Sequence, residues 1–272
     1  MNKRPTVEEH LASMGAAGRR ICEIDASEAG AGNISICVDE LPRLRDVFPI
    51  SERIELPLPA PHLVGRTLLV TGSGRRLRQI ADDPAAAIGA VVVDGDGLRA
   101  EMLTSPRRAF DRLTSEFNSH LGVHDDQVGR RDLPFHAVVH AQPPHLTHLS
   151  HIPAYRSDRA MNAAILRWEP ESIVALSKGI GVLEFMVPGS TTLMDANVAR
   201  LRDVEIVLWS KHGTMSRSDV SVTRAVDRVE YAETGAKYEY MNLLAGGRGE
   251  GLLPEEVRAV ADAFGVESPW VG

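Results

Sequence analysis

The apolar runs of this chain are short, and helices do not separate them in the regular alternation that builds a doubly wound parallel sheet. Runs rich in β-branched and apolar residues predict strands over residues 33–38, 66–72, 87–95, 135–141, 172–177, 182–187 and 204–210. Helical spacing of apolar residues predicts helices over residues 7–25, 107–124, 190–203 and 219–244, with shorter helices after Pro143 and Pro254. We therefore expect an α/β fold, a single domain over residues 1–272, in which helices cover a mostly antiparallel central sheet.

Composition narrows the class of protein. The 272 residues carry a formal net charge of −7 and a pI near 5.8, which argues against a general nucleic-acid binder. The N-terminus lacks the apolar core of a signal peptide, and no run approaches the ~18 apolar residues of a membrane span. Because Cys22 and Cys37 are the only cysteines, we expect reduced thiols rather than a disulfide framework. These features predict a cytoplasmic protein that binds neither nucleic acid nor membranes.

Residues 135–152 hold five of the ten histidines, a density that suggests a metal. Residues two apart on a strand share a face, so a metal at the strand end could take His140 Nε2 and the Gln142 side-chain oxygen together. His212 follows another apolar strand and precedes a glycine, which leaves it room to reach a ligand. A purely structural role is equally open for any one of these histidines. We expect the rest of the stretch to lie outside the site, namely His136, His145, His148 and His151.

Two polar turns rich in glycine, residues 30–33 and 71–74, expose backbone N–H groups that suit an anion. Thr114, Ser115 and Glu116 place two hydroxyls and one carboxylate side by side. They also fit a helix N-terminus, which caps itself with hydroxyls and accepts phosphate. Each feature alone is weak evidence, and their combined order along the chain is far more distinctive.

In that order, the motifs GAGNIS, LLVTGSG, LTSEFNSH, VVHAQPPHL and VEIVLWSKHG resemble the class II aldolase/adducin family, in particular its rhamnulose-1-phosphate aldolase branch. The resemblance covers residues 15–267. It implies a three-layer fold and a homotetramer with active sites at subunit interfaces. It also implies reversible cleavage of a ketose 1-phosphate into dihydroxyacetone phosphate and an aldehyde, which is L-lactaldehyde for L-rhamnulose 1-phosphate. A divalent metal, zinc above all, would polarise the substrate carbonyl.

The resemblance also implies a role for individual residues. Glu116 falls on the position of the catalytic carboxylate, and Glu171 on that of a second acidic residue of the site. His140, His212 and Gln142 fall on the three metal-ligand positions. The positions implied to bind the phosphate and substrate are Gly32, Asn33, Thr71, Gly72, Ser73, Gly74, Thr114 and Ser115.

The sequence departs from the family pattern at two positions. Gln142 replaces a histidine, and its neutral, harder oxygen should hold zinc less tightly, which leaves Mn²⁺ or Co²⁺ open as the ion. Gly30 stands where the branch usually carries asparagine. Two alternatives therefore remain, namely an aldolase or epimerase acting on a different sugar phosphate, and a non-catalytic adducin-like binding protein. The acid that protonates the leaving group is not identified, and the candidates are Tyr155, Tyr231, Tyr238 and Tyr240.

Overall fold

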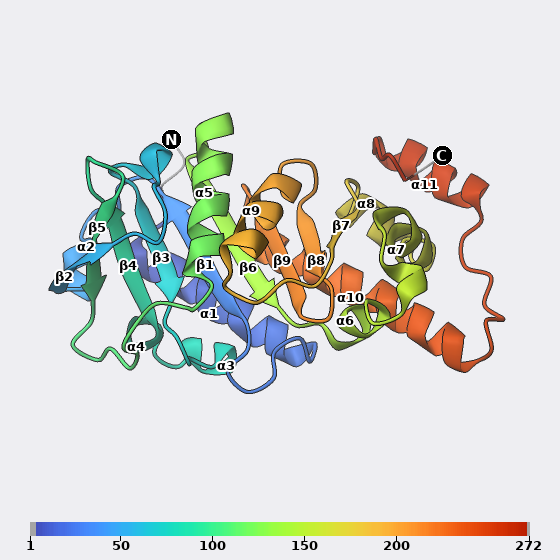
Figure 1. Ribbon diagram of the computed structural model, residues 1–272, viewed down its shortest axis with the longest axis horizontal. Helices are drawn as coiled ribbons and strands as arrows, with labels where there is room; N and C mark the ends of the chain where they lie inside the picture. Colours follow the sequence, from blue (N-terminus) through green and yellow to red (C-terminus); the bar gives the residue numbers. More distant parts are fainter. Residues whose placement is uncertain (1–3, 271–272) are drawn as a thin grey trace.

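A nine-stranded sheet forms the centre of the computed structural model, which describes residues 4–270 (Figure 1). The strand order is β2-β5-β4-β3-β1-β6-β9-β8-β7, and every neighbouring pair is antiparallel except β7–β8. The strands are β1 (Asn33–Val38), β2 (Ile50–Glu55), β3 (Thr67–Thr71), β4 (Ile88–Val93), β5 (Arg99–Thr104), β6 (Phe135–Ala141), β7 (Ile180–Leu183), β8 (Ile206–Trp209) and β9 (Gly213–Ser218). The expected mostly antiparallel α/β sheet is confirmed.

Helices cover both faces of the sheet and complete the expected three layers (Figure 1). One face carries α1 (Val7–Glu23), α3 (Leu77–Ile80), α4 (Pro84–Ala87), α6 (Pro144–Leu149) and α10 (Val222–Leu244). The other face, in front in Figure 1, carries α5 (Phe117–Arg131), α9 (Thr191–Arg200) and the short η1 (Pro61–Leu63). The remaining helices are α2 (Leu44–Val47), η2 (Pro153–Tyr155), α7 (Asp158–Ile165), α8 (Pro170–Ala175) and α11 (Pro254–Phe264). Within residues 4–270, none of the helices has both the length and the apolar character needed to cross a bilayer.

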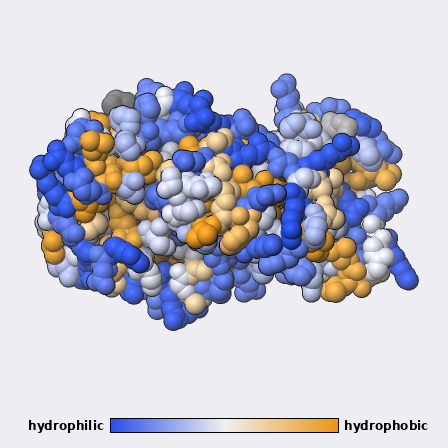
Figure 2. All heavy atoms as spheres, in the orientation of Figure 1, coloured by the Kyte–Doolittle hydropathy of each residue, from blue (hydrophilic) through white to orange (hydrophobic). Residues whose placement is uncertain are grey.

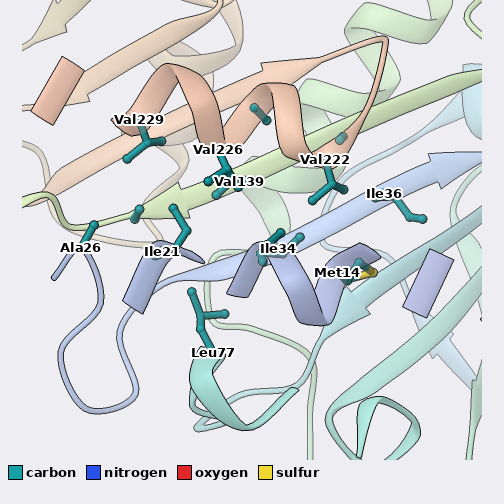
Figure 3. Close-up of a cluster of buried hydrophobic side chains, with 14 of the residues drawn as sticks. Met14, Ile21, Ala26, Ile34, Ile36, Leu77, Val139, Val222, Val226 and Val229 are labelled. Atoms are coloured by element: carbon teal, nitrogen blue, oxygen red, sulfur yellow. The ribbon is translucent and has the colours of Figure 1, made fainter. Parts of the chain in front are cut away.

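Alternation along the central strands sorts their side chains between the two layers. On β1, Ile34 and Ile36 point toward α1 and α10 and are fully buried there. Figure 3 shows Met14 from α1 and Val226 from α10 in this cluster. Burial of such side chains contributes about 1.5–3 kcal/mol each. The intervening residues of β1 face α5, so polar side chains on that face are enclosed as well.

The two long helices that pack against Ile34 and Ile36, α1 and α10, each begin at a side-chain N-cap. The Thr6 hydroxyl accepts the Glu9 N–H at 3.2 Å, and the Glu9 carboxylate accepts the Thr6 N–H at 2.6 Å. This capping box satisfies two backbone donors that the first turn of α1 leaves unpaired. The Ser221 hydroxyl caps α10 by accepting the Arg224 N–H at 3.0 Å.

Three predicted elements were wrong. The helix predicted over residues 107–124 begins only at Phe117, because Thr114 N–H donates to Thr71 O at 3.0 Å and holds the preceding segment against β3. Residues 172–177, predicted as a strand, lie mostly in α8, where Pro170 occupies a first-turn position. The strand predicted over residues 182–187 ends at Leu183.

Strands β2, β5 and β9 were not predicted. β2 is an edge strand whose charged side chains remain exposed, so it lacks an apolar pattern. β9 reads Gly-Thr-Met-Ser-Arg-Ser and is polar, yet every one of its residues is buried between β6 and β8. Pairing with neighbours, rather than local composition, makes these segments strands.

Candidate metal centre

His140 lies near the end of β6 on the face covered by α5. Its Nδ1–H donates to the carbonyl of Thr214 at 2.8 Å, which leaves the Nε2 lone pair free. Nε2 lies 3.4 Å from Oε2 of Glu116, and both side chains are buried. Such a backbone partner fixes the tautomer and the ring orientation that a metal ligand requires.

The turn between β8 and β9 carries His212. Lys211 adopts a left-handed φ of 65° in this turn, an outlier for a non-glycine residue of the kind that gathers at functional sites. A Cβ on Gly213 would lie 2.5 Å from the carbonyl oxygen of Ala141, so only glycine lets the turn approach β6 this closely. His212 Nε2 is thereby brought to 3.6 Å from Glu116 Oε1. Burial, together with nearby His140, lowers the pKa of His212 and favours the neutral ring that binds metals.

Glu116 completes the group from the N-cap position of α5, where it is buried. Ligand atoms of Glu116, His140 and His212 all lie within 4.8 Å of one another. Across residues 4–270, no other three histidine, cysteine, aspartate or glutamate side chains converge in this way. Two imidazole nitrogens and one carboxylate oxygen fit a zinc, manganese or cobalt ion.

Gln142 follows β6 and lies beside this centre. Its Cγ is 3.0 Å from the position that a Cβ on Gly213 would occupy, so the side chain borders the turn that carries His212. The expectation from strand alternation, that Gln142 and His140 turn toward one face, agrees with this placement. Its backbone N–H donates to Ala26 O at 2.8 Å, which anchors the segment.

Trp209 was not singled out from the sequence, yet it packs against both histidine rings. Its ring centroid lies 4.8 Å from that of His140, nearly parallel, and 5.2 Å from that of His212. Its Nε1–H donates to Asn197 Oδ1 at 2.9 Å, which holds the indole in place. The indole therefore limits how far either imidazole can rotate. A signal existed in the sequence, since Trp209 ends the strand that delivers His212.

The polar turns predicted from the sequence lie next to the centre. A Cβ on Gly30 would lie 3.9 Å from the Gly74 carbonyl oxygen, so the two glycine-rich turns are neighbours. Gly32 and Gly74 have φ of 82° and 71°, which glycine adopts without strain. Asn33 pairs with His140 across β1 and β6. Two backbone donors of the 71–74 turn are already used within the chain, since the Gly72 N–H donates to Ala87 O and the Ser73 N–H to Arg112 O, both at 2.8 Å. The Thr71 hydroxyl accepts the Ile34 N–H at 3.1 Å and can still donate its own proton.

Glu171 is the one predicted site residue that lies apart from the others. It is exposed on α8, where it borders a hollow together with Tyr231 and Phe264. His145, which we expect to lie outside the site, bonds through Nδ1 to Glu233 on α10. Tyr155 donates its hydroxyl to Glu239 at 2.6 Å, and burial with this contact raises its pKa to about 12.

Comparison with known proteins places this geometry in context. The family described as Class II Aldolase and Adducin N-terminal domain matches residues 12–240. The rhamnulose-1-phosphate aldolase of Bacteroides thetaiotaomicron is 25% identical over 269 residues, which cover 97% of each chain. That of Klebsiella pneumoniae is 28% identical over 244 residues, covering 88% of this chain and 87% of its own. The crystal structure of a sugar-phosphate aldolase from Thermotoga maritima superposes with a TM-score of 0.74 at 27% identity, covering 89% of this chain and 98% of its own.

Proposed function

Because the chain belongs to the class II aldolase and adducin family, we propose that it is a metal-dependent aldolase acting on a ketose 1-phosphate. Family membership and the likeness to aldolases over nearly its whole length make it a lyase. In the proposed reaction, the sugar phosphate is cleaved reversibly to dihydroxyacetone phosphate and an aldehyde. The observation that carries the proposal is the convergence of Glu116, His140 and His212.

His140 and His212 would hold the divalent metal, with the Gln142 oxygen as a third protein ligand. The ion, most simply Zn²⁺, with Mn²⁺ or Co²⁺ suited to the harder Gln142 oxygen, supplies Lewis acidity at the substrate carbonyl. Glu116 transfers the proton at the carbon next to that carbonyl, delivering it on cleavage and removing it on condensation. Its burial and its bond to Asn33 hold the carboxylate in one orientation for this transfer.

The two glycine turns and the segment before α5 form the proposed phosphate pocket. The hydrogen bond from Asn33 to Glu116 and the left-handed φ of Gly32 and Gly74, a conformation found in anion-binding turns, support this role. The residues assigned to the pocket are Gly32, Asn33, Thr71, Gly72, Ser73, Gly74, Thr114 and Ser115. L-Rhamnulose 1-phosphate is the proposed substrate, with L-lactaldehyde as the aldehyde, because the relatives from Bacteroides thetaiotaomicron and Klebsiella pneumoniae are rhamnulose-1-phosphate aldolases.

Glu171 would reach the site from a neighbouring subunit of a homotetramer. Its exposure on α8, apart from Glu116, supports this arrangement over a role within its own subunit. Hydrophobic surface is available for assembly, since Phe185 and Val187 are 55% and 65% exposed. Further apolar residues reach the surface near the end of α10 (Figure 2), where Leu244 is 71% exposed. The two free cysteines suit the cytoplasm, which we propose as the compartment.

One observation favours a second candidate, an aldolase or epimerase acting on a different sugar phosphate. Gln142 lies at the centre itself, and Gly30 borders the proposed phosphate pocket, so both departures from the family pattern touch the substrate region. The same Gln142 would suit a non-catalytic, adducin-like binding protein if it abolished metal binding.

Elemental analysis of untagged protein, followed by a cleavage assay, tests these candidates. Near-stoichiometric metal together with metal-dependent cleavage of L-rhamnulose 1-phosphate is the expected result. If the protein holds metal but cleaves only the C4 epimer of L-rhamnulose 1-phosphate, the second candidate would be favoured. Protein that takes up no zinc, manganese or cobalt and cleaves neither sugar would contradict the aldolase proposal.

A further inference from the structure

A chain of buried polar side chains runs from Glu116 into the interior, away from the phosphate turns. Asn33 Nδ2 donates to Glu116 Oε2 at 2.9 Å, and Asn33 Oδ1 bonds to Nε2 of His120. The chain continues through Ser35, whose hydroxyl lies 2.6 Å from His120 Nδ1 and 2.7 Å from His124 Nε2.

The chain ends one strand further, on β6. His124 Nδ1 lies 2.8 Å from Nδ1 of His136. Ser35 and the three histidines of the chain are completely buried. Apart from the bond between His120 and Asn33, none of these four side chains is hydrogen-bonded to the phosphate turns within residues 4–270, so this hydrogen-bond network extends behind the site.

Matched repeats of a helix and a strand build this arrangement. Glu116, His120 and His124 recur every four residues and form one stripe along α5, a spacing of about 6 Å. Asn33 and Ser35 are two apart on β1, a spacing of about 6.6 Å, and face that stripe. Each step along the helix therefore meets the next side chain of the strand.

The hydrogen bonds of the chain can point in only one direction. Asn33 presents its amide nitrogen to Glu116, which leaves the amide oxygen of Asn33 to be satisfied by a donor. His120 supplies that donor at Nε2, and as a neutral ring it then accepts at Nδ1. Burial lowers the pKa of His120 well below its usual value, which favours the neutral ring.

The same reasoning assigns the remaining protons. The Ser35 hydroxyl donates to His120 Nδ1, so its oxygen accepts from Nε2–H of His124. Burial lowers the pKa of His124 to about 3, and this neutral ring accepts at Nδ1 from Nδ1–H of His136. His136 Nε2 is then a buried acceptor, and within residues 4–270 it has no hydrogen-bond partner.

We propose that His120 and His124 are positioning residues, which act through Ser35 and Asn33 to hold the Glu116 carboxylate in its reactive orientation. This inference rests on the proposed function. Without the donor from His120, the Asn33 amide could rotate and turn its oxygen toward the carboxylate. The Glu116 carboxylate would then lose its bond to Asn33 and gain the freedom to rotate out of line with the substrate carbon.

Solid-state NMR of protein labelled with ¹⁵N only in histidine tests the direction without reference to activity. We expect His120 and His124 to carry their proton on Nε2 and His136 on Nδ1 at pH 7, with signals assigned through His120→Gln and His124→Gln variants. Protonation of His120 on Nδ1, or on both nitrogens, would overturn the inference.

Two serine variants test the effect on catalysis. Ser35→Ala breaks the chain, whereas Ser119→Ala removes an equally buried hydroxyl that has no bonding partner within residues 4–270. We expect kcat of Ser35→Ala to fall about tenfold or more, as with partners that orient metal ligands, with KM and metal content unchanged. Ser119→Ala should keep the parent kcat, and Ser35→Thr, which retains the hydroxyl, should recover most of it.

Equal kcat in Ser35→Ala and the parent would overturn the positioning role, as would equal losses in the two alanine variants. If Ser35→Ala does not fold, the tautomer pattern and the Ser35→Thr variant still decide the matter. A parent protein without any turnover would instead refute the proposed function. The tautomer measurement does not depend on turnover, so it still tests the direction of the hydrogen bonds behind Glu116.

Discussion

The side-chain amide of Asn33 donates to the Glu116 carboxylate at 2.9 Å and joins the first residue of β1 to the N-cap residue of α5. Eighty-three residues separate the two along the chain. Through this bond the proposed proton-transfer group is tied to the sheet that also carries His140.

Replacing Glu116 by glutamine should remove the proton-transfer group while keeping a side chain of the same size and shape. The Asn33 amide can still donate to the new side-chain oxygen, so folding and metal content should remain near those of the parent. We expect kcat to fall by roughly 10²- to 10⁴-fold, the usual contribution of a positioned acid–base group. Steady-state kinetics and elemental analysis check this. Turnover at the parent rate would show that another residue transfers the proton, and loss of metal would make Glu116 a ligand.

Gln142→His should raise zinc affinity, because it places an imidazole beside His140 and His212 where an amide oxygen now lies. An increase of about 10- to 100-fold is expected, measured by competition with a chelator. Gln79→His is the matched control, since Gln79 is exposed on α3 and its substitution should leave affinity unchanged. An unchanged affinity in the Gln142 variant would mean that another group already completes the coordination.

Gly213→Ala should destabilise the β8–β9 turn, because the new Cβ would lie 2.5 Å from the Ala141 carbonyl oxygen and 3.2 Å from His140 Cε1. Overpacking of this kind costs about 1–3 kcal/mol of unfolding free energy, and displacement of His212 should also weaken metal binding. Urea denaturation measures the loss. Gly95→Ala is the control, since a Cβ there meets nothing within 4 Å. Similar losses at both positions would contradict the steric argument.

Stability should fall as the pH drops below about 6.5, the ordinary pKa of histidine. Burial lowers the pKa of His120 and His136 well below that value and that of His124 to about 3. In this window the unfolded chain binds protons that the folded chain does not, so acid favours unfolding. Each such histidine contributes up to about 1.4 kcal/mol per pH unit.

Urea denaturation at pH 7.5, 6.5 and 5.5 measures this dependence. A His124→Gln variant that still folds should show a slope smaller by about one proton. An unfolding free energy that stays constant between pH 6.5 and 5.5 would contradict neutral burial of the three rings.

Glu171 and Glu116 should complement one another between subunits. Glu116→Gln and Glu171→Gln should each be inactive alone. Glu169→Gln is the control, since Glu169 is the N-cap residue of α8, two residues before Glu171, and this variant should stay active. After the two inactive variants are unfolded and refolded together, roughly a quarter of the sites in random closed oligomers would combine both native carboxylates. Recovered activity near that fraction would support an interfacial site. No recovery would place Glu171 in the site of its own subunit, or outside it.

The local pattern of apolar and polar residues was sufficient to predict much of the fold. β1, β6 and β8 are rich in β-branched and apolar residues and are covered on both faces. α1 and α10 show helical spacing of apolar residues after a side-chain N-cap. β9 escaped detection because pairing on both edges buries polar residues that the local sequence marks as exposed. α8 was misread as a strand because a short apolar run carries no periodicity that separates the two forms.

The amino-acid sequence by itself determined the class of fold, the family motifs and the residue types available for chemistry. Strand parity also placed His140 and Gln142 on one side, since alternation is a local property of extended chain. Only the tertiary structure decided which histidines meet Glu116. The sequence offered His212 as a candidate, but its approach to Glu116 comes from the β8–β9 turn, while His145 bonds to Glu233 on α10.

The buried hydrogen-bond network behind Glu116 likewise depends on the tertiary structure. The four-residue spacing of Glu116, His120 and His124 is visible in the sequence, but so are many such spacings on exposed helices. Its meaning comes from the register of β1 beneath α5, which sets Asn33 and Ser35 between those side chains. Register is a property of packed elements, and hydrogen bonds between residues far apart in sequence exist only once that packing has formed.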